Sequence, residues 1–286
     1  MIISQLTGGL GNQMFQYALG FSLAKKLRTE FKYKFVNFQG ATPRNIEIDN
    51  LKISSIPASP TDLKEIGYPT NLLSKILSKF GLKASLVRSE KSFNFEKSAL
   101  NLPDSSYIQG YWQSEKYFID FENDIRKEFR FKVPSTKKND EILEEIHSSN
   151  SVSVHVRRGD YVADTKTNAF HGTCDLKYYE KAMALIEKKI KNPVYFFFSD
   201  DPEWVKMNLK SEHKKYYVDW NQGNQSYIDM HLMSKCKHNI IANSSFSWWG
   251  AWLNSNPTKI VIAPKKWFSD ITVNTSDLVP KTWDKI

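Results

Sequence analysis

Apolar and polar residues alternate in a short segment in the middle of the chain. Between 151 and 157 valine alternates with serine, histidine and arginine, so an extended strand there has one apolar and one polar face. Valine is β-branched and favours a pleated strand. Arg-Arg-Gly-Asp at 157–160 then ends the segment. The pattern predicts a strand over 151–157, with two arginines at its carboxyl end.

Strands and helices alternate regularly after this segment. Pro193–Phe198 is a continuous apolar run, as expected for a strand that is covered on both faces. The further strands predicted are 215–219, 239–242 and 259–263, and the predicted helices are 176–191, 202–209, 225–235 and 245–253. This alternation predicts a parallel, Rossmann-like sheet in the C-terminal half.

The N-terminal half is less regular. A strand over Ile2–Leu6 leads into a glycine turn at 8–11 and a helix over 13–27 with one apolar face. Residues 107–113 are expected to form a strand that runs into an aromatic and polar loop, and residues 114–129 a helix. Aromatic and polar residues there suit either a sugar-binding loop or the edge of the core.

One basic segment has two interpretations. Residues 71–88 contain three lysines and one arginine and no acid, with apolar residues at helical spacing up to Phe80. Such a helix can lie on an anionic membrane surface or pack its apolar face on the core, and Gly81 interrupts it.

A polar stretch with a proline at 132–140 is the best linker candidate. It divides the chain into an N-terminal domain, 1–135, and a C-terminal ligand-binding domain, 136–286. We leave open that the extreme C-terminus packs back on the first domain.

Composition limits the class of protein. The chain has 286 residues, 41% hydrophobic and 14% aromatic, which is typical of a packed globular protein. The net charge of +9 favours anionic partners such as nucleotides. Cys174 and Cys236 are too few for a disulfide framework, and no Cys/His cluster has zinc spacing. Without a charged leader or an apolar run of about 20 residues, we expect a cytoplasmic protein.

The candidate ligand-binding residues follow the predicted strands. Arg157 and Arg158 can hold a phosphate or close the strand end by pairing with an aspartate. Asp200 and Asp201 follow the strand at 193–198, where a carboxylate can read guanine or cap a helix that starts at Pro202.

Two helix starts are further candidates. Asn243, Ser244 and Ser245 can cap the helix at 245–253, and its free amides can bind an anion. The three tryptophans of that helix are expected in the core. The glycine turn lets a ligand approach the backbone at Gly9 and Gly11, or is simply a tight turn. Its spacing is not that of a dinucleotide fingerprint, so NAD is not predicted.

Three motifs in this order resemble those of bacterial-type α1,2-fucosyltransferases of glycosyltransferase family 11: Gly-Gly-Leu-Gly-Asn-Gln at 8–13, His-Val-Arg-Arg-Gly-Asp-Tyr at 155–161, and Asn-Ser-Ser-Phe-Ser-Trp-Trp-Gly at 243–250. The resemblance implies a GT-B-like α/β fold with two Rossmann-like domains facing a cleft. In such a fold, domain 1–135 is expected on the acceptor side, and domain 136–286 is expected to bind GDP-fucose. It implies inverting transfer of L-fucose from GDP-β-L-fucose to the 2-hydroxyl of a terminal galactose in an oligosaccharide or lipid-linked glycan.

The resemblance also implies roles for individual residues. Asn12 lies near the transferred sugar, Arg157 and Arg158 neutralise the leaving GDP, and His155 with Asp200 or Asp201 places the nucleoside. The other expected donor-binding residues are Gly9, Gly11, Asn243, Ser244, Ser245 and Phe246.

The catalytic base stays open among three residues. Asp160 orients the arginines or acts as the base, and Asp164 and His171 are the other candidates. No D-x-D sequence occurs, so neither a metal nor another cofactor is expected.

Two alternatives remain. Another GDP-sugar transferase on the same fold would keep the arginine motif. A basic nucleic-acid-binding protein would gather its lysines and aromatic residues on one stretch, whereas the lysines here are dispersed. We therefore expect no nucleic acid as a partner, and an anionic membrane only through residues 71–88.

Overall fold

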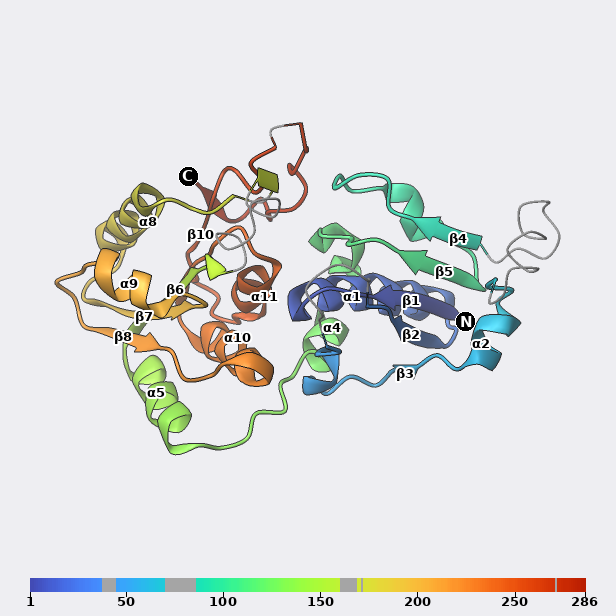
Figure 1. The fold of residues 1–286 in the computed structure, drawn as a ribbon, viewed down its shortest axis with the longest axis horizontal. Coiled ribbons are helices and arrows are strands. Elements are labelled where there is room, and N and C mark those ends of the chain that lie inside the picture. Colours follow the sequence, from blue (N-terminus) through green and yellow to red (C-terminus); the bar gives the residue numbers. More distant parts are fainter. Residues whose placement is uncertain (38–44, 70–85, 160–168, 171, 271) are drawn as a thin grey trace. The chain divides into compact units, whose positions relative to one another are not determined.

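The computed structural model describes residues 1–37, 45–69, 86–159, 169–170, 172–270 and 272–286. It divides into two compact units (Figure 1). The first unit contains Met1–Arg130 and Asn274–Leu278, and the second contains Phe131–Val273 and Val279–Ile286. A short piece near the C-terminus therefore belongs to the first unit, while the last residues belong to the second.

The first unit is built on a parallel five-stranded sheet with the order β3-β2-β1-β5-β4. Its strands are β1 (Ile2–Leu6), β2 (Phe31–Phe35), β3 (Ile56–Pro57), β4 (Leu86–Ser89) and β5 (Ser106–Gln109). The strand predicted over 107–113 corresponds to β5, which ends at Gln109. The hydrophobic pattern did not reveal β2, β3 and β4, because β2 contains two lysines, β3 has only two residues and β4 is largely exposed.

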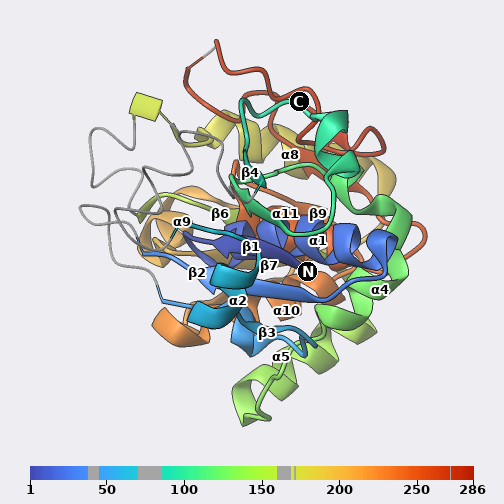
Figure 2. The same ribbon diagram turned by 90° about the vertical axis from the view of Figure 1, so that its right-hand side faces the viewer.

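Helices cover both faces of this sheet (Figures 1 and 2). Helix α1 (Leu10–Leu27) contacts the face of Ser4, whose hydroxyl donates to the Gln16 carbonyl at 2.8 Å. Helix α2 (Pro60–Glu65) packs Leu63 against Ile3 on the opposite face. The first unit also contains 3-10 turns at Ile48–Asn50 and Lys97–Asn101.

The helix predicted over 114–129 is wrong as one element. The structure has 3-10 turns at Glu115–Tyr117 and Ile119–Phe121, followed by α4 (Glu122–Glu128). Phe118 lies between the two turns with φ of −142°, which is not helical, and its side chain is buried beside Phe15. Burying this ring breaks the helix.

The second unit has a six-stranded parallel sheet in the order β11-β10-β9-β6-β7-β8. The strands are β6 (Asn150–Val156), β7 (Pro193–Ser199), β8 (Lys215–Val218), β9 (His238–Ile240), β10 (Val261–Ala263) and β11 (Asp284–Lys285). The helices are α5 (Lys137–Ser148), α8 (Leu176–Lys189), α9 (Pro202–Asn208), α10 (Ser226–Lys235) and α11 (Ser245–Leu253), with a 3-10 turn at Gly223–Gln225.

This unit confirms the predicted Rossmann-like sheet, and it adds two elements. Helix α5 begins inside the polar stretch expected to be a linker, and β11 extends the sheet at its edge. The predicted fold class, α/β with a parallel Rossmann-like sheet in each of two units, is thus confirmed.

Strand β6 is the centre of the second unit. Its valine face packs into a cluster with Tyr179 and Phe197. The polar face is buried as well, so the strand is covered on both sides. The Asn239 amide satisfies the Ser153 hydroxyl at 2.7 Å, so this buried polar pair is hydrogen-bonded. The three tryptophans of α11 are buried in the core, as predicted.

Most of the basic segment at 71–88 lies outside the described residues. Its last three residues, 86–88, belong to β4, so a helix does not extend through them. In the described part of the chain, no helix has the length and apolar character needed to cross a bilayer.

Candidate functional site

The two arginines of the central motif lie where β6 ends, and two aspartates from the end of β7 hold them. Arg157 pairs with Asp200 at 2.9 Å between Nη1 and Oδ2. The other oxygen of Asp200 accepts from the Arg158 backbone N–H at 2.8 Å. Asp201 accepts from the Arg158 side chain at 3.2 Å. Because β6 and β7 are parallel neighbours, their carboxyl ends bring the two motifs together.

Asp201 also begins helix α9. Its carboxylate accepts from the Trp204 N–H at 3.2 Å, with Pro202 at the first helical position. The helix-cap interpretation of Asp201 is therefore confirmed. The Arg158 guanidinium lies 4.2 Å from the centroid of the Trp204 ring, so a cation–π contact fixes its plane as well. Both aspartates have partners here, so a guanine base would share their carboxylate oxygens with the arginines.

Gly159 allows the close approach of the two strand ends. A Cβ atom at this position would lie 2.7 Å from Oδ2 of Asp200, the oxygen that pairs with Arg157. Any side chain there would push this carboxylate away. The glycine of the Arg-Arg-Gly-Asp motif is thus explained by the aspartate that it accommodates.

His155 lies two residues before Arg157, and it is almost completely buried. Its ring is 5.6 Å from the ring of Phe246, which belongs to the first turn of α11. Burial lowers the pKa of His155 to about 4, against the nearby Asp200 charge, which raises it. The imidazole is therefore neutral at neutral pH. Among the described residues, its Nδ1 has no hydrogen-bond partner.

The start of α11 is capped by its own serine. The Ser244 hydroxyl accepts from the Phe246 N–H at 3.3 Å, and the first turn carries no acid. Asn243 does not act as a cap. Its buried side-chain amide donates to the carbonyls of Gly172 and Trp267. An anion at the start of α11 would therefore accept hydrogen bonds from the backbone amides near Ser245.

The glycine motif of the first unit places Asn12 in the first turn of α1. Gly8 has φ of +76°, and a Cβ atom there would lie 2.8 Å from the Asn12 amide nitrogen. The Asn12 carbonyl oxygen accepts from the Gln113 amide at 2.9 Å. The start of α1 thus meets the loop after β5, a contact that the sequence motifs did not reveal.

The N-terminus of α1 is already occupied by a carboxylate. Gly9 provides no side-chain cap, and Glu47 instead accepts from the Leu10 N–H at 2.6 Å. Gln13 fixes that segment by accepting from the backbone N–H of Glu47 at 2.9 Å. Glu47 is 37 positions from Leu10 in the chain and follows no motif, so nothing in the sequence pointed to it.

Three of the predicted residues cannot be placed. Asp160, Asp164 and His171 lie outside the described residues.

Cys174 and Cys236 are free and buried, and burial raises the pKa of the Cys174 thiol to about 12, which makes it unreactive. Within the described ranges, no three His, Cys, Asp or Glu residues gather as metal ligands would.

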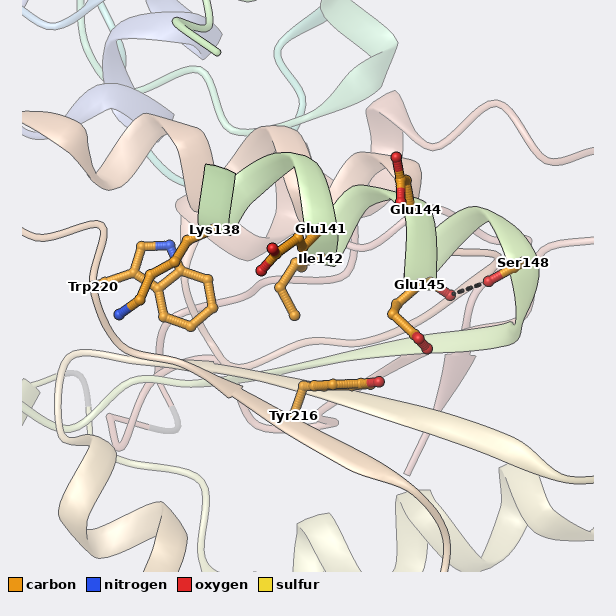
Figure 3. A pocket seen from close by; sticks show the side chains of 8 residues that line it. All are labelled: Lys138, Glu141, Ile142, Glu144, Glu145, Ser148, Tyr216 and Trp220. Atoms are coloured by element: carbon orange, nitrogen blue, oxygen red, sulfur yellow. Dashed lines mark hydrogen bonds between the residues drawn. The ribbon is translucent and has the colours of Figure 1, made fainter. Parts of the chain in front are cut away.

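A cavity of about 710 Å³ lies elsewhere in the second unit, between α5 and β8 (Figure 3). It contains none of the predicted site residues. Its walls include the carboxylates of Glu141, Glu144 and Glu145, together with the aromatic rings of Tyr216 and Trp220. Lys138 is the one cationic residue among those that line it, so the carboxylates outnumber the cation and disfavour a nucleoside diphosphate there.

Comparisons with known proteins give the family. The model described as "Glycosyl transferase family 11" matches residues 2–286. An α-1,2-colitosyltransferase of Escherichia coli is 36% identical, over 100% of this chain and 99% of its own length. The O-antigen biosynthesis glycosyltransferase WbnK of Escherichia coli is 33% identical, over 98% of both chains.

More distant similarities are also found. Galactoside 2-α-L-fucosyltransferase Sec1 of Mus musculus is 24% identical over 90% of this chain and 66% of its own. Among solved structures, the α-1,6-fucosyltransferase NodZ soaked with GDP-fucose has a TM-score of 0.49 and 16% identity, covering 90% of this chain and 96% of its own. The family match and the full-length relatives confirm the predicted family: this chain is a glycosyltransferase and belongs to glycosyl transferase family 11.

Proposed function

We propose that the protein transfers L-fucose from GDP-β-L-fucose to the 2-hydroxyl of a terminal galactose, with inversion. One observation carries the proposal most directly: two arginines at the carboxyl end of β6, each held by its own aspartate from β7. Guanidinium forks that are fixed in this way suit the diphosphate of a nucleotide sugar.

The charges of the site fit the departure of GDP. As the bond to the sugar breaks, negative charge grows on the β-phosphate, and preorganised cationic donors stabilise it. Arg157 and Arg158 are half-buried, so their donors are partly shielded from water. His155 stays neutral beside them and offers a nitrogen without adding another charge.

A single in-line attack explains the stereochemistry. The donor sugar is β-linked, so attack by the acceptor hydroxyl from the opposite side gives an α linkage. The name of the E. coli colitosyltransferase contains the same α-1,2 linkage. We propose Asn12 as the residue beside the transferred sugar, and Asp160, Asp164 and His171 as the candidates for the base that takes the hydroxyl proton.

A second donor is favoured by one observation. The full-length relative at 36% identity is a colitosyltransferase, and colitose is fucose that lacks the 3-hydroxyl group. The arginine site would serve either donor, because it acts on the diphosphate. The choice depends on whether a protein group hydrogen-bonds the 3-hydroxyl of the sugar, since leaving such a group unpaired is costly.

A donor panel tests both versions. Purified protein is incubated with GDP-fucose, GDP-colitose or GDP-mannose and a β-galactoside, and the product linkage is determined by NMR. We expect α1,2-fucosyl product and no transfer from GDP-mannose. A product from GDP-colitose alone would replace the donor but keep the site. Transfer from GDP-mannose, or a different linkage, would overturn the proposal.

A further inference from the structure

Three loops meet at one edge of the sheet in the first unit. Strands β1, β4 and β5 are parallel, so the residues that follow them emerge on the same side. The loops begin at Thr7, Glu90 and Gly110, and the carboxyl edge of a parallel sheet is where ligands bind.

Glu90 holds the loop that follows β5 by hydrogen bonds. Its two carboxylate oxygens accept from consecutive backbone amides, Tyr111 N–H at 2.6 Å and Trp112 N–H at 2.9 Å. The loop needs such support, because Trp112 has φ of +55°, an uncommon conformation for a bulky residue. Gly110 has φ of +146°, and a Cβ there would lie 2.4 Å from Cβ of Glu90. The carboxylate thus selects one strained form of this loop.

The loop that Glu90 holds presents an aromatic ring and a side-chain amide. Tyr111 is 39% exposed, whereas its neighbour Trp112 is buried. The Tyr111 ring stands nearly parallel to that of Phe93, with 8° between the planes and 6.3 Å between the centroids, and the Tyr111 backbone is held by Glu90. Two residues later, Gln113 donates to Asn12 at 2.9 Å. One short loop therefore carries a fixed aromatic face and reaches the residue of the glycine motif.

We propose that Tyr111 is the stacking platform for the acceptor galactose, and that Glu90 is a positioning residue that holds this platform. The proposal rests on the proposed function, because it assumes that the acceptor ends in galactose. The axial 4-hydroxyl of galactose leaves C3, C4 and C5 with their hydrogens on one apolar face, which packs on an aromatic ring. The amides of Gln113 and Asn12 lie along the same edge and can bind hydroxyl groups.

The surroundings of Glu90 make its hydrogen bonds to the loop sensitive to pH. Burial raises the pKa of Glu90 to about 7, against the two backbone N–H groups, which lower it, and Glu96 raises it further. Glu96 itself pairs with Arg88 and accepts from the Lys91 N–H. Near Glu90, the phenols of Tyr111 and Tyr117 have raised pKa values because of burial, so they stay neutral. Protonating Glu90 removes one of the two acceptors that hold the loop.

Exchanging Tyr111 tests the platform. We expect Tyr111→Ala to raise the acceptor KM about tenfold, which corresponds to the loss of one aromatic contact, with a smaller change in kcat. Tyr111→Phe keeps the ring and should stay within about twofold of the wild type. The probe is a β-galactoside disaccharide. Met207→Ala, at an exposed position of α9, is the control and should leave the acceptor KM unchanged.

Exchanging Glu90 tests the positioning role. In the wild type, the acceptor KM should rise as the pH falls from about 8 to about 6, because the protonated carboxyl holds one amide less. Glu90→Gln mimics this protonated form, so its acceptor KM should be high and flat over the same range. Glu65→Gln, an exposed exchange at the end of α2, is the matched control and should follow the wild type.

The outcomes separate this inference from the proposed function. If the wild type transfers no sugar to a galactoside, the proposed function has failed. If it transfers sugar and Tyr111→Ala leaves the acceptor KM unchanged, the platform is refuted. If Glu90→Gln keeps the wild-type pH profile, the positioning role is refuted. Should Glu90→Gln fail to fold, the two Tyr111 variants still test the platform, and a wild-type acceptor KM that does not change between about pH 8 and about pH 6 would refute the positioning role.

Discussion

Two helices of this protein start in the same structural setting and end up with opposite electrostatics. Helix α1 follows the strand β1, and α11 follows the strand β9, so each begins at the carboxyl edge of a parallel sheet. At the N-terminus of α1, the Glu47 carboxylate accepts a hydrogen bond from the Leu10 N–H. The N-terminus of α11 is capped by the neutral Ser244, and no acid lies in its first turn.

This difference indicates which of the two helix starts can bind an anionic ligand. A helix N-terminus has a partial positive charge of about half an elementary charge, and Glu47 already neutralises that of α1. A phosphate beside Glu47 would be repelled. The start of α11 keeps its positive end, and His155 beside Phe246 links it to the strand that carries Arg157. We therefore expect the donor diphosphate at α11 and the arginines, and a neutral sugar near Asn12.

The largest expected effect lies at Arg157. Arg157→Lys keeps the positive charge but loses the planar fork, so we expect a fall in kcat of about 10²–10³. Arg158→Lys should be milder and should act more on the donor KM, because Arg158 is held by both Asp201 and Trp204, and we expect it to bind the diphosphate in the ground state as well.

Steady-state kinetics with varied GDP-fucose distinguish the two arginines. Lys137→Arg, at the exposed start of α5, is a suitable control. Wild-type kcat in Arg157→Lys would refute the assignment of the second unit as the diphosphate site, and with it the contrast between the two helix starts.

The next effect concerns His155 and the stability of the second unit. Burial depresses the pKa of His155 from 6.5 to about 4. Between these values the unfolded chain binds a proton that the native state does not, so stability is lost as the pH falls. From about pH 7 to about pH 5 this amounts to about 2 kcal/mol.

Urea unfolding at both pH values checks this prediction. His155→Gln carries no titrating group, so it should lose about 2 kcal/mol less than the wild type over the same pH step. The exposed His147→Gln is the matched control and should lose as much as the wild type. An identical pH response of His155→Gln and the wild type would mean that the imidazole is not held neutral in the folded protein.

The sequence predicted the second unit far better than the first, for physical reasons. Strand β7 is a run of buried aromatic residues, and its helices repeat with clear apolar faces, so the pattern is strong. In the first unit, β3 has two residues and contains a proline, and β4 is largely exposed. Such strands are held by their neighbours in the sheet rather than by their own pattern. Helix α5 was hidden because its first turn is polar and follows a proline.

For the site, the sequence identified the motifs but not the contacts between them. Arg157 and Asp200 both stood out, since each follows a predicted strand. Their ion pair depends on β6 and β7 being neighbours, which the order along the chain does not fix. Glu47 and Glu90 carried no signal, because each acts on backbone amides of a distant loop rather than within a motif.

A smaller effect is expected at Glu47. Glu47→Gln removes the charge from the start of α1 and keeps an oxygen that can accept from Leu10, so we expect destabilisation of about 1 kcal/mol or less. The donor KM should not change, because the diphosphate does not bind there. Urea unfolding and donor kinetics measure the two quantities. A donor KM that falls severalfold in Glu47→Gln would show that α1 does face the diphosphate, and the contrast between the two helices would be wrong.

The smallest expected effect is that of removing divalent ions. If the arginines and the amides of α11 stabilise the leaving GDP, no metal is needed to do so, and the sequence has no D-x-D motif to bind one. We expect transferase activity in excess EDTA within about twofold of that in magnesium, a difference too small to correspond to the loss of a catalytic charge. The measurement is repeated with Arg157→Lys, because a metal that assists the diphosphate should matter most where the fork is missing. Loss of most activity in EDTA, restored by magnesium or manganese, would mean that the cationic side chains of the second unit are not sufficient.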